Sequence, residues 1–165
     1  MAKGDLIPFE NTGATKMGGS IKFFVASGTT GSILAGEPVQ KLAGVAGAST
    51  MPTAGPTATL RLAGVAMSLS TETAAVAGLV DVITPTPGQM WMCAPLSAAA
   101  IATQALYNAL IGKRVLFDKT AGVYTVATAT VDAGSNGLII EYSDVTRYPG
   151  MVVFSFSNVV DYRNV

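Results

Sequence analysis

Residues 112–157 constrain the fold most strongly, because short apolar runs alternate there with turn-forming residues. Residues 114–118 show the period of two that is typical of a strand with two unlike faces. The run that begins at Val123 follows a short turn ending at Gly122, so the two runs are expected to pair as a hairpin. Two further pairs of turn residues precede apolar runs, Asn136-Gly137 and Pro149-Gly150. These patterns predict a compact antiparallel sheet.

The upstream part of the chain carries further strand patterns, bounded by glycine, proline, serine and threonine. They lie at residues 21–25, 59–66, 78–83 and 89–94. Strand signals that recur roughly every dozen residues are typical of a sandwich or a barrel. We therefore expect a mainly β protein, a small antiparallel β-barrel or sandwich with one short helix and an extended N-terminal arm.

The one helix candidate is residues 97–111, most securely 103–110. Ser97 is a good N-cap residue, alanine and leucine favour helix, and Gly112 supplies a stop. Three apolar residues are expected to share one stripe of this helix: Ile101, Ala105 and Leu110. We expect the helix to lie across one end of the sheet.

Residues 1–20 contain four glycines and a proline and have no sustained period. Such a segment buries too little surface to order itself, so we interpret it as an arm that is either mobile or held by a neighbour. Leu6, Ile7 and Phe9 are its candidate partner-binding anchors. The expected organisation is thus an N-terminal arm over 1–20 and a single β-rich domain over 21–165.

The composition predicts a surface that is covered by other subunits. Half of the residues are hydrophobic and only 12% are charged, with ten basic residues balancing ten acidic ones. Free monomers usually stay soluble through dispersed charge, although a neutral monomer rich in surface Thr, Ser and Gly fits the same numbers. The balanced charge does not predict attraction to nucleic acid or to an anionic membrane.

The residues that usually carry catalysis are scarce. The chain has no histidine, and its single cysteine, Cys93, lies in an apolar run where a buried thiol is expected. The carboxylates are scattered and show no catalytic or calcium-loop spacing. We therefore predict no enzyme activity, no catalytic or metal-binding residues and no cofactor. Trp91 and the tyrosines are expected to have structural roles, with Tyr124 and Tyr142 covering core edges, although a sugar-stacking or base-stacking platform is the alternative.

From Asn108 to Phe156 the chain resembles the head-decoration, or capsid cement, proteins of tailed bacteriophages. The resemblance is carried by four runs, IGKRVLFD from Ile111, GVYTV from Gly122, GLIIE from Gly137 and PGMVVFSF from Pro149. Upstream runs at AGEPV, GVA and GLVDV are similar to the opening strands of that family. The resemblance implies a small β-rich, barrel-like domain with one short helix and no catalytic residues.

The resemblance also implies a function. Decoration proteins bind the outer surface of the head lattice, contact the major capsid protein, often as trimers or dimers, and reinforce the head. The expected location is thus the capsid exterior of a virion assembled in the host cytoplasm, with no direct nucleic-acid or membrane contact. The alternatives are another phage structural β-protein, such as a tail-tube, head-fibre or head-completion subunit, and a carbohydrate-binding module.

Overall fold

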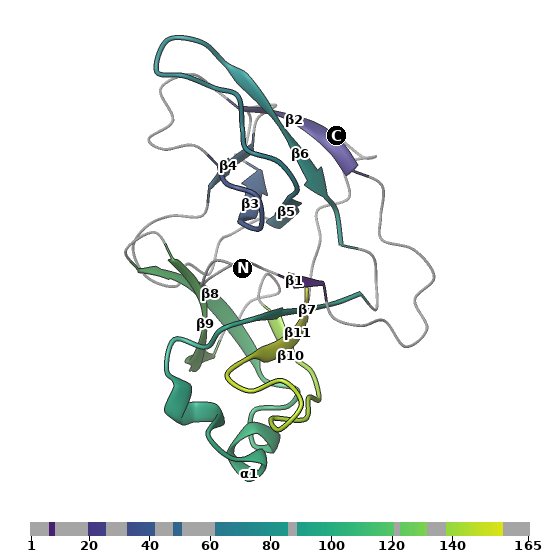
Figure 1. Ribbon diagram of the computed structural model, residues 1–165, viewed down its shortest axis with the longest axis vertical. Helices are drawn as coiled ribbons and strands as arrows, with labels where there is room; N and C mark the ends of the chain where they lie inside the picture. Colours follow the sequence, from purple (N-terminus) through teal and green to yellow (C-terminus); the bar gives the residue numbers. More distant parts are fainter. Residues whose placement is uncertain are drawn as a thin grey trace.

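The computed structural model describes residues 7–8, 20–25, 33–41, 48–50, 62–85, 89–120, 123–131 and 138–156. These residues form two antiparallel sheets, named sheet A and sheet B, and a short helical segment. Figure 1 shows sheet B above sheet A, with α1 (Gln104–Asn108) at the far end of sheet A. The predicted mainly β, antiparallel fold is confirmed, as two sheets and not as one closed barrel.

Sheet B is built from residues that precede position 84. Its five strands follow the order β2 (Ser20–Val25), β6 (Gly78–Ile83), β5 (Leu62–Ala66), β3 (Pro38–Lys41) and β4 (Ala48–Thr50). Strands were predicted at 21–25, 59–66 and 78–83, and β2, β5 and β6 lie there. The sheet curls until β4 comes near β2. The inward side chains of its strands form one apolar cluster with Ile33: Phe23, Val25, Val39, Ala66, Val80 and Val82.

Sheet A contains most of the C-terminal half and one strand from the start of the chain. Its six strands follow the order β1 (Ile7–Pro8), β7 (Met90–Cys93), β11 (Val152–Phe156), β10 (Leu138–Ile140), β8 (Arg114–Thr120) and β9 (Val123–Val131). The predicted hairpin is confirmed, because β8 and β9 pair from Thr120 and Val123 outward. The runs after Asn136-Gly137 and Pro149-Gly150 form β10 and β11, which pair with each other.

The outer edge of β7 has two different neighbours. Trp91 and Met92 pair with the two residues of β1. Just beyond β7, the Val126 N–H donates to the Ala94 carbonyl at 2.9 Å, and the Leu96 N–H donates to the Val126 carbonyl at 2.8 Å. Sheet A therefore curls far enough for β9 to meet the segment after β7, which makes it a partly closed barrel.

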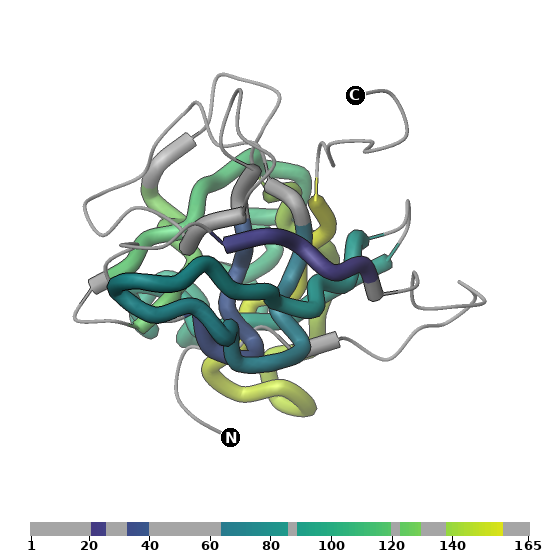
Figure 2. Tube along the Cα trace, turned by 90° about the horizontal axis from the view of Figure 1, so that it is seen from above, coloured from purple at the N-terminus to yellow at the C-terminus, as the bar shows by residue number. Residues whose placement is uncertain are grey.

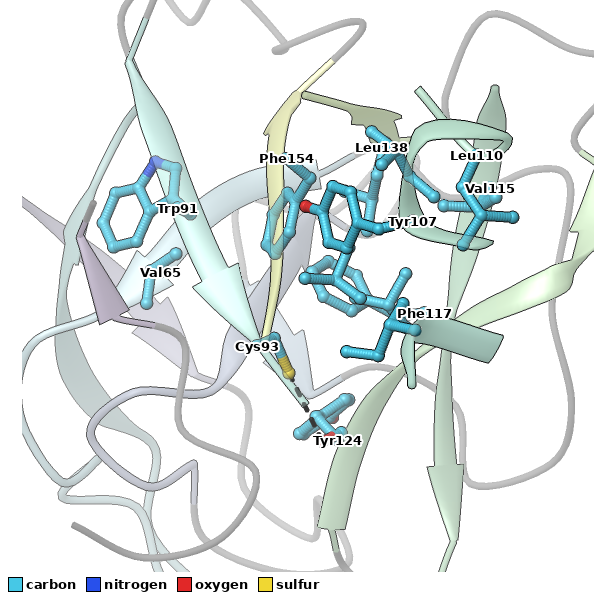
Figure 3. Close-up of a cluster of buried hydrophobic side chains, with 14 of the residues drawn as sticks. Val65, Trp91, Cys93, Tyr107, Leu110, Val115, Phe117, Tyr124, Leu138 and Phe154 are labelled. Carbon is cyan, nitrogen blue, oxygen red and sulfur yellow. Dashed lines mark hydrogen bonds between the residues drawn. The ribbon is translucent and has the colours of Figure 1, made fainter. Parts of the chain in front are cut away.

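The main apolar core fills the inside of sheet A. Figure 3 shows Phe117, Phe154 and Tyr107 side by side in this core, with Trp91 and Val65 nearby. The Phe117 and Phe154 rings meet edge to face, with centroids 5.5 Å apart, a geometry that aromatic pairs favour. Val65 and Ile83 come from sheet B, so the core of sheet A extends to the other sheet.

The helix prediction is correct in place and wrong in extent. The structure has a 3-10 turn, η1 (Ala98–Ile101), followed by the five-residue α1. Ser97 makes no capping hydrogen bond, whereas the Thr103 side chain accepts one from the Leu106 N–H. A new N-cap thus begins α1 where a continuous helix was expected. In the expected stripe, Ile101 and Leu110 are buried and Ala105 is exposed.

Candidate contact surfaces

Exposed apolar side chains lie on the outward surface of sheet B. Phe24 of β2 and Leu79 of β6 are direct cross-strand partners, and their side chains are 44% and 48% exposed. The Met67 N–H donates to the Asp81 carbonyl at 2.7 Å, so the exposed Met67 continues the apolar surface on the other side of β6. Figure 2 looks onto this end of the molecule, with β2 and the segment 62–85 nearest to the viewer.

A cation and an anion share this outward surface. Lys22 is the cross-strand partner of Asp81, two pairs further along β2 and β6 than Phe24 and Leu79. Side chains two residues apart in a strand point to the same face, so all four side chains face outward together. We call these residues, with Met67, the sheet B face: Lys22, Phe24, Met67, Leu79 and Asp81. Because its two charges cancel, the sheet B face presents a neutral, largely apolar surface.

A second group of exposed apolar side chains lies beside η1 and α1. Its members are Leu96, Leu106, Ile111 and Tyr142, which we call the helix end. The Gln104 amide donates to the Ser143 carbonyl at 3.0 Å, so the segment that carries Tyr142 is held against α1. The helix end and the sheet B face lie at opposite ends of the molecule (Figure 1).

One buried ion pair connects the two sheets. Lys119 Nζ on β8 lies 3.4 Å from Glu37 Oε1, which precedes β3, and the two side chains are 11% and 9% exposed. Glu37 Oε2 also accepts a hydrogen bond from the Leu34 N–H, and Lys119 Nζ lies 4.5 Å from the centre of the Tyr124 ring. Buried charges need such partners because desolvation is costly. The pair therefore fixes sheet B against sheet A.

Tyr107 anchors α1 to sheet A. Its side chain is fully buried, and its hydroxyl accepts from the Val153 N–H at 2.8 Å and donates to the Glu141 carbonyl at 3.1 Å. Burial raises the pKa of the Tyr107 phenol above its usual value, because the charged phenolate is poorly solvated inside the protein. The phenol thus serves as a neutral structural group.

The described residues bring no catalytic constellation together. No group of three His, Cys, Asp or Glu side chains that could hold a metal occurs among them. Glu141 accepts from the Ser155 hydroxyl at 2.6 Å, and Asp144 accepts from the Thr146 N–H of a turn. Cys93 is buried, as expected, and its thiol donates to the Tyr124 carbonyl at 3.5 Å. Within the same ranges, no helix has the length and apolarity that a membrane span requires.

The aromatic side chains are divided between the core and the surface. Trp91, Tyr107 and Tyr124 are buried. Tyr142 is 63% exposed and follows the end of β10, so the expectation that it covers a core edge is wrong. Glu141 and Tyr142 lie past the last paired residue of β10, and the segment that follows is held against α1 by Gln104. A stacking strip made of Trp91 and these tyrosines does not form.

The arm anchors named from the sequence are only partly covered by the structure. Ile7 lies in β1 and pairs with Met92 of β7. Leu6 and Phe9 lie outside the described residues, and their role as partner-binding residues stays a prediction. Sequence reasoning did not single out the sheet B face. Its signal was Phe24 directly after Phe23, since adjacent residues of a strand point to opposite faces.

Comparisons with known proteins add no assignment: no protein-family model, no curated protein and no solved structure matches this chain.

Proposed function

We propose that this chain is a virion structural protein of the decoration type, which binds the outer surface of a phage head lattice, contacts the major capsid protein and associates with itself. The observation that supports the proposal most directly is the pair of exposed apolar surfaces at opposite ends of a weakly charged molecule. A lattice subunit needs two such surfaces, one for the lattice and one for a neighbour. Monomers that work alone seldom expose extended apolar patches.

In this proposal the helix end faces the head. Leu106 and Ile111 flank the C-terminal turn of the helical segment, which is fixed to sheet A through Tyr107. A contact surface on a fixed element loses little conformational entropy when it binds. The low charge of the chain also means that few charged groups are desolvated in a wide contact.

The test uses heads assembled without this chain. The purified protein is mixed with them at increasing concentration, and bound protein is measured after sedimentation, together with the temperature at which the heads release their DNA. We expect saturable binding and a higher release temperature. Leu106→Lys and Ile111→Lys should each weaken binding about tenfold or more, because a charge is forced into an apolar contact. Absence of binding by the folded wild-type protein, or binding that both variants retain, would contradict the proposal.

The arm provides an independent part of the test. Leu6, Ile7 and Phe9 are proposed to contribute to head attachment, so a chain that lacks residues 1–20 should bind heads more weakly. The structure adds that this truncation removes β1 and leaves Trp91 and Met92 without that strand partner. Unfolding of the truncated chain, measured by circular dichroism, would show that the arm belongs to the core of the domain.

A further inference from the structure

We infer that the sheet B face is the surface through which two copies of this chain associate, with a two-fold axis running between β2 and β6. The role of this contact in a head lattice rests on the proposed function. The contact between two copies can be measured without any head. The partner that covers the sheet B face is the sheet B face of a second copy.

The first argument is the apolar content of an outward sheet surface. Phe24 and Leu79 lie directly opposite each other and are nearly half exposed, although the residues that flank them in the same strands are buried. Met67 and Leu69 are also exposed next to β6. Antiparallel sheets commonly keep one face in water, and that face is then polar. Two sheets with apolar faces pack against each other with nearly aligned strands, so a second sheet surface is the fitting partner.

The second argument is charge complementarity. Lys22 and Asp81 are cross-strand partners on the sheet B face, and they therefore lie on opposite sides of a line drawn between β2 and β6. Rotation by half a turn about an axis along that line exchanges the positions of β2 and β6. Lys22 of one copy then faces Asp81 of the other, and Phe24 faces Leu79. The contact gains two equivalent ion pairs beside two equivalent apolar contacts, which is the self-complementarity that a two-fold interface requires.

The charge pattern also argues against other occupants. A partner with charge of a single sign meets both a cation and an anion on the sheet B face and is repelled by one of them. Among the described residues, Lys22 takes part in no ion pair. A second copy supplies a carboxylate for each Lys22. The chain as a whole is neutral, so two copies approach without net repulsion.

The experiment is a charge-swap series on the purified full chain, with association measured by sedimentation equilibrium over a wide concentration range. We expect wild type to dimerise reversibly. Lys22→Glu should weaken dimerisation about tenfold or more, since two attractive pairs become repulsive. Asp81→Lys should have a similar effect, and the double variant Lys22→Glu with Asp81→Lys should restore the wild-type constant to within about threefold, since the pairs are re-formed with reversed polarity.

Controls separate this contact from folding and from head binding. Leu79→Ser should also weaken dimerisation, and circular dichroism shows whether each variant remains folded. Leu106→Lys at the helix end should leave dimerisation unchanged. A wild type that stays monomeric throughout, a double variant that fails to recover, or a folded Leu106→Lys variant that dissociates would each overturn the inference. Loss of head binding with intact dimers would count against the proposed function alone.

Discussion

The buried Lys119–Glu37 pair is the interaction whose removal best tests how the two sheets are held together. Glu37→Gln keeps the size of the side chain and an oxygen for the Leu34 N–H, but it leaves the Lys119 ammonium without its counter-ion. Removing one partner of a buried pair typically costs about 3–5 kcal/mol. The nearby Tyr124 ring offsets about 1 kcal/mol of that by a cation–π contact. We therefore expect the free energy of unfolding to fall by about 2–4 kcal/mol.

A double-mutant cycle isolates the pair from its surroundings. Lys119→Met leaves Glu37 unpaired and is expected to be destabilising, whereas the double variant Glu37→Gln with Lys119→Met leaves no buried charge at the site. The double variant should therefore be less destabilised than the sum of the two single variants, with a coupling energy of about 2 kcal/mol or more. Lys113→Met is the matched control, because Lys113 is exposed, and should change stability by less than about 0.5 kcal/mol.

Urea unfolding followed by two signals makes the assay specific to the junction between the sheets. Trp91, the single tryptophan, is buried in the core of sheet A, so its fluorescence reports on that sheet. Far-ultraviolet circular dichroism reports on both sheets. In Glu37→Gln the dichroism signal should change at lower urea than the fluorescence, as sheet B separates first. A coupling energy below about 0.5 kcal/mol, the level of exposed pairs, would refute this reasoning.

Further predictions concern a glycine and a tyrosine. Gly64→Ala should destabilise by about 3 kcal/mol or more in urea unfolding, because its Cβ would overlap the carbonyl oxygen of Ile83. Gly112→Ala, which also has positive φ but meets only open space, should cost about 1–2 kcal/mol; equal losses at both sites would contradict the steric explanation. Tyr107→Phe should cost about 1–3 kcal/mol by leaving the buried Val153 N–H without its acceptor, and an unchanged midpoint would show that the bond contributes nothing. Since the pKa of Tyr107 is raised in the folded state, its contribution is present below the usual tyrosine pKa of 10.0 and is lost as pH rises through the folded value. Wild type should therefore lose stability above pH 10 more steeply than Tyr107→Phe, as measured by urea unfolding at each pH.

The strands were predictable because local signals agree with the fold. Gly78–Ile83 was predicted with the bounds that β6 has, since a glycine precedes a run of β-branched and leucine residues and a proline follows soon after. The β8–β9 hairpin follows from the turn that ends at Gly122 between two alternating runs. The local sequence is sufficient to predict these elements.

The features that were missed depend on contacts between distant residues. The helix was predicted as one element because residues with high helix propensity, alanine above all, extend across 97–111. Helix propensity does not show where an N-cap forms. The start of α1 is set by the Thr103 cap and by the hydrogen bond that the Tyr107 hydroxyl accepts from the Val153 N–H of β11. Val153 lies far from α1 in the sequence. Likewise, Glu37 and Lys119 are separated by 82 positions, and no local pattern relates them. The sheet B face required knowledge of which side of β2 is covered.

The arrangement around β7 has a consequence for the order in which the protein folds during synthesis. All five strands of sheet B have left the ribosome once Ile83 has emerged, so this sheet is free to fold early. β7 is different, because it lies between β1 from the first residues and β11 from near the last. Until β11 is made, one edge of β7 stays open, whereas β1 is available from the start to cover part of the other. The earliest strand of the chain thus protects a half-built sheet from pairing with its neighbours.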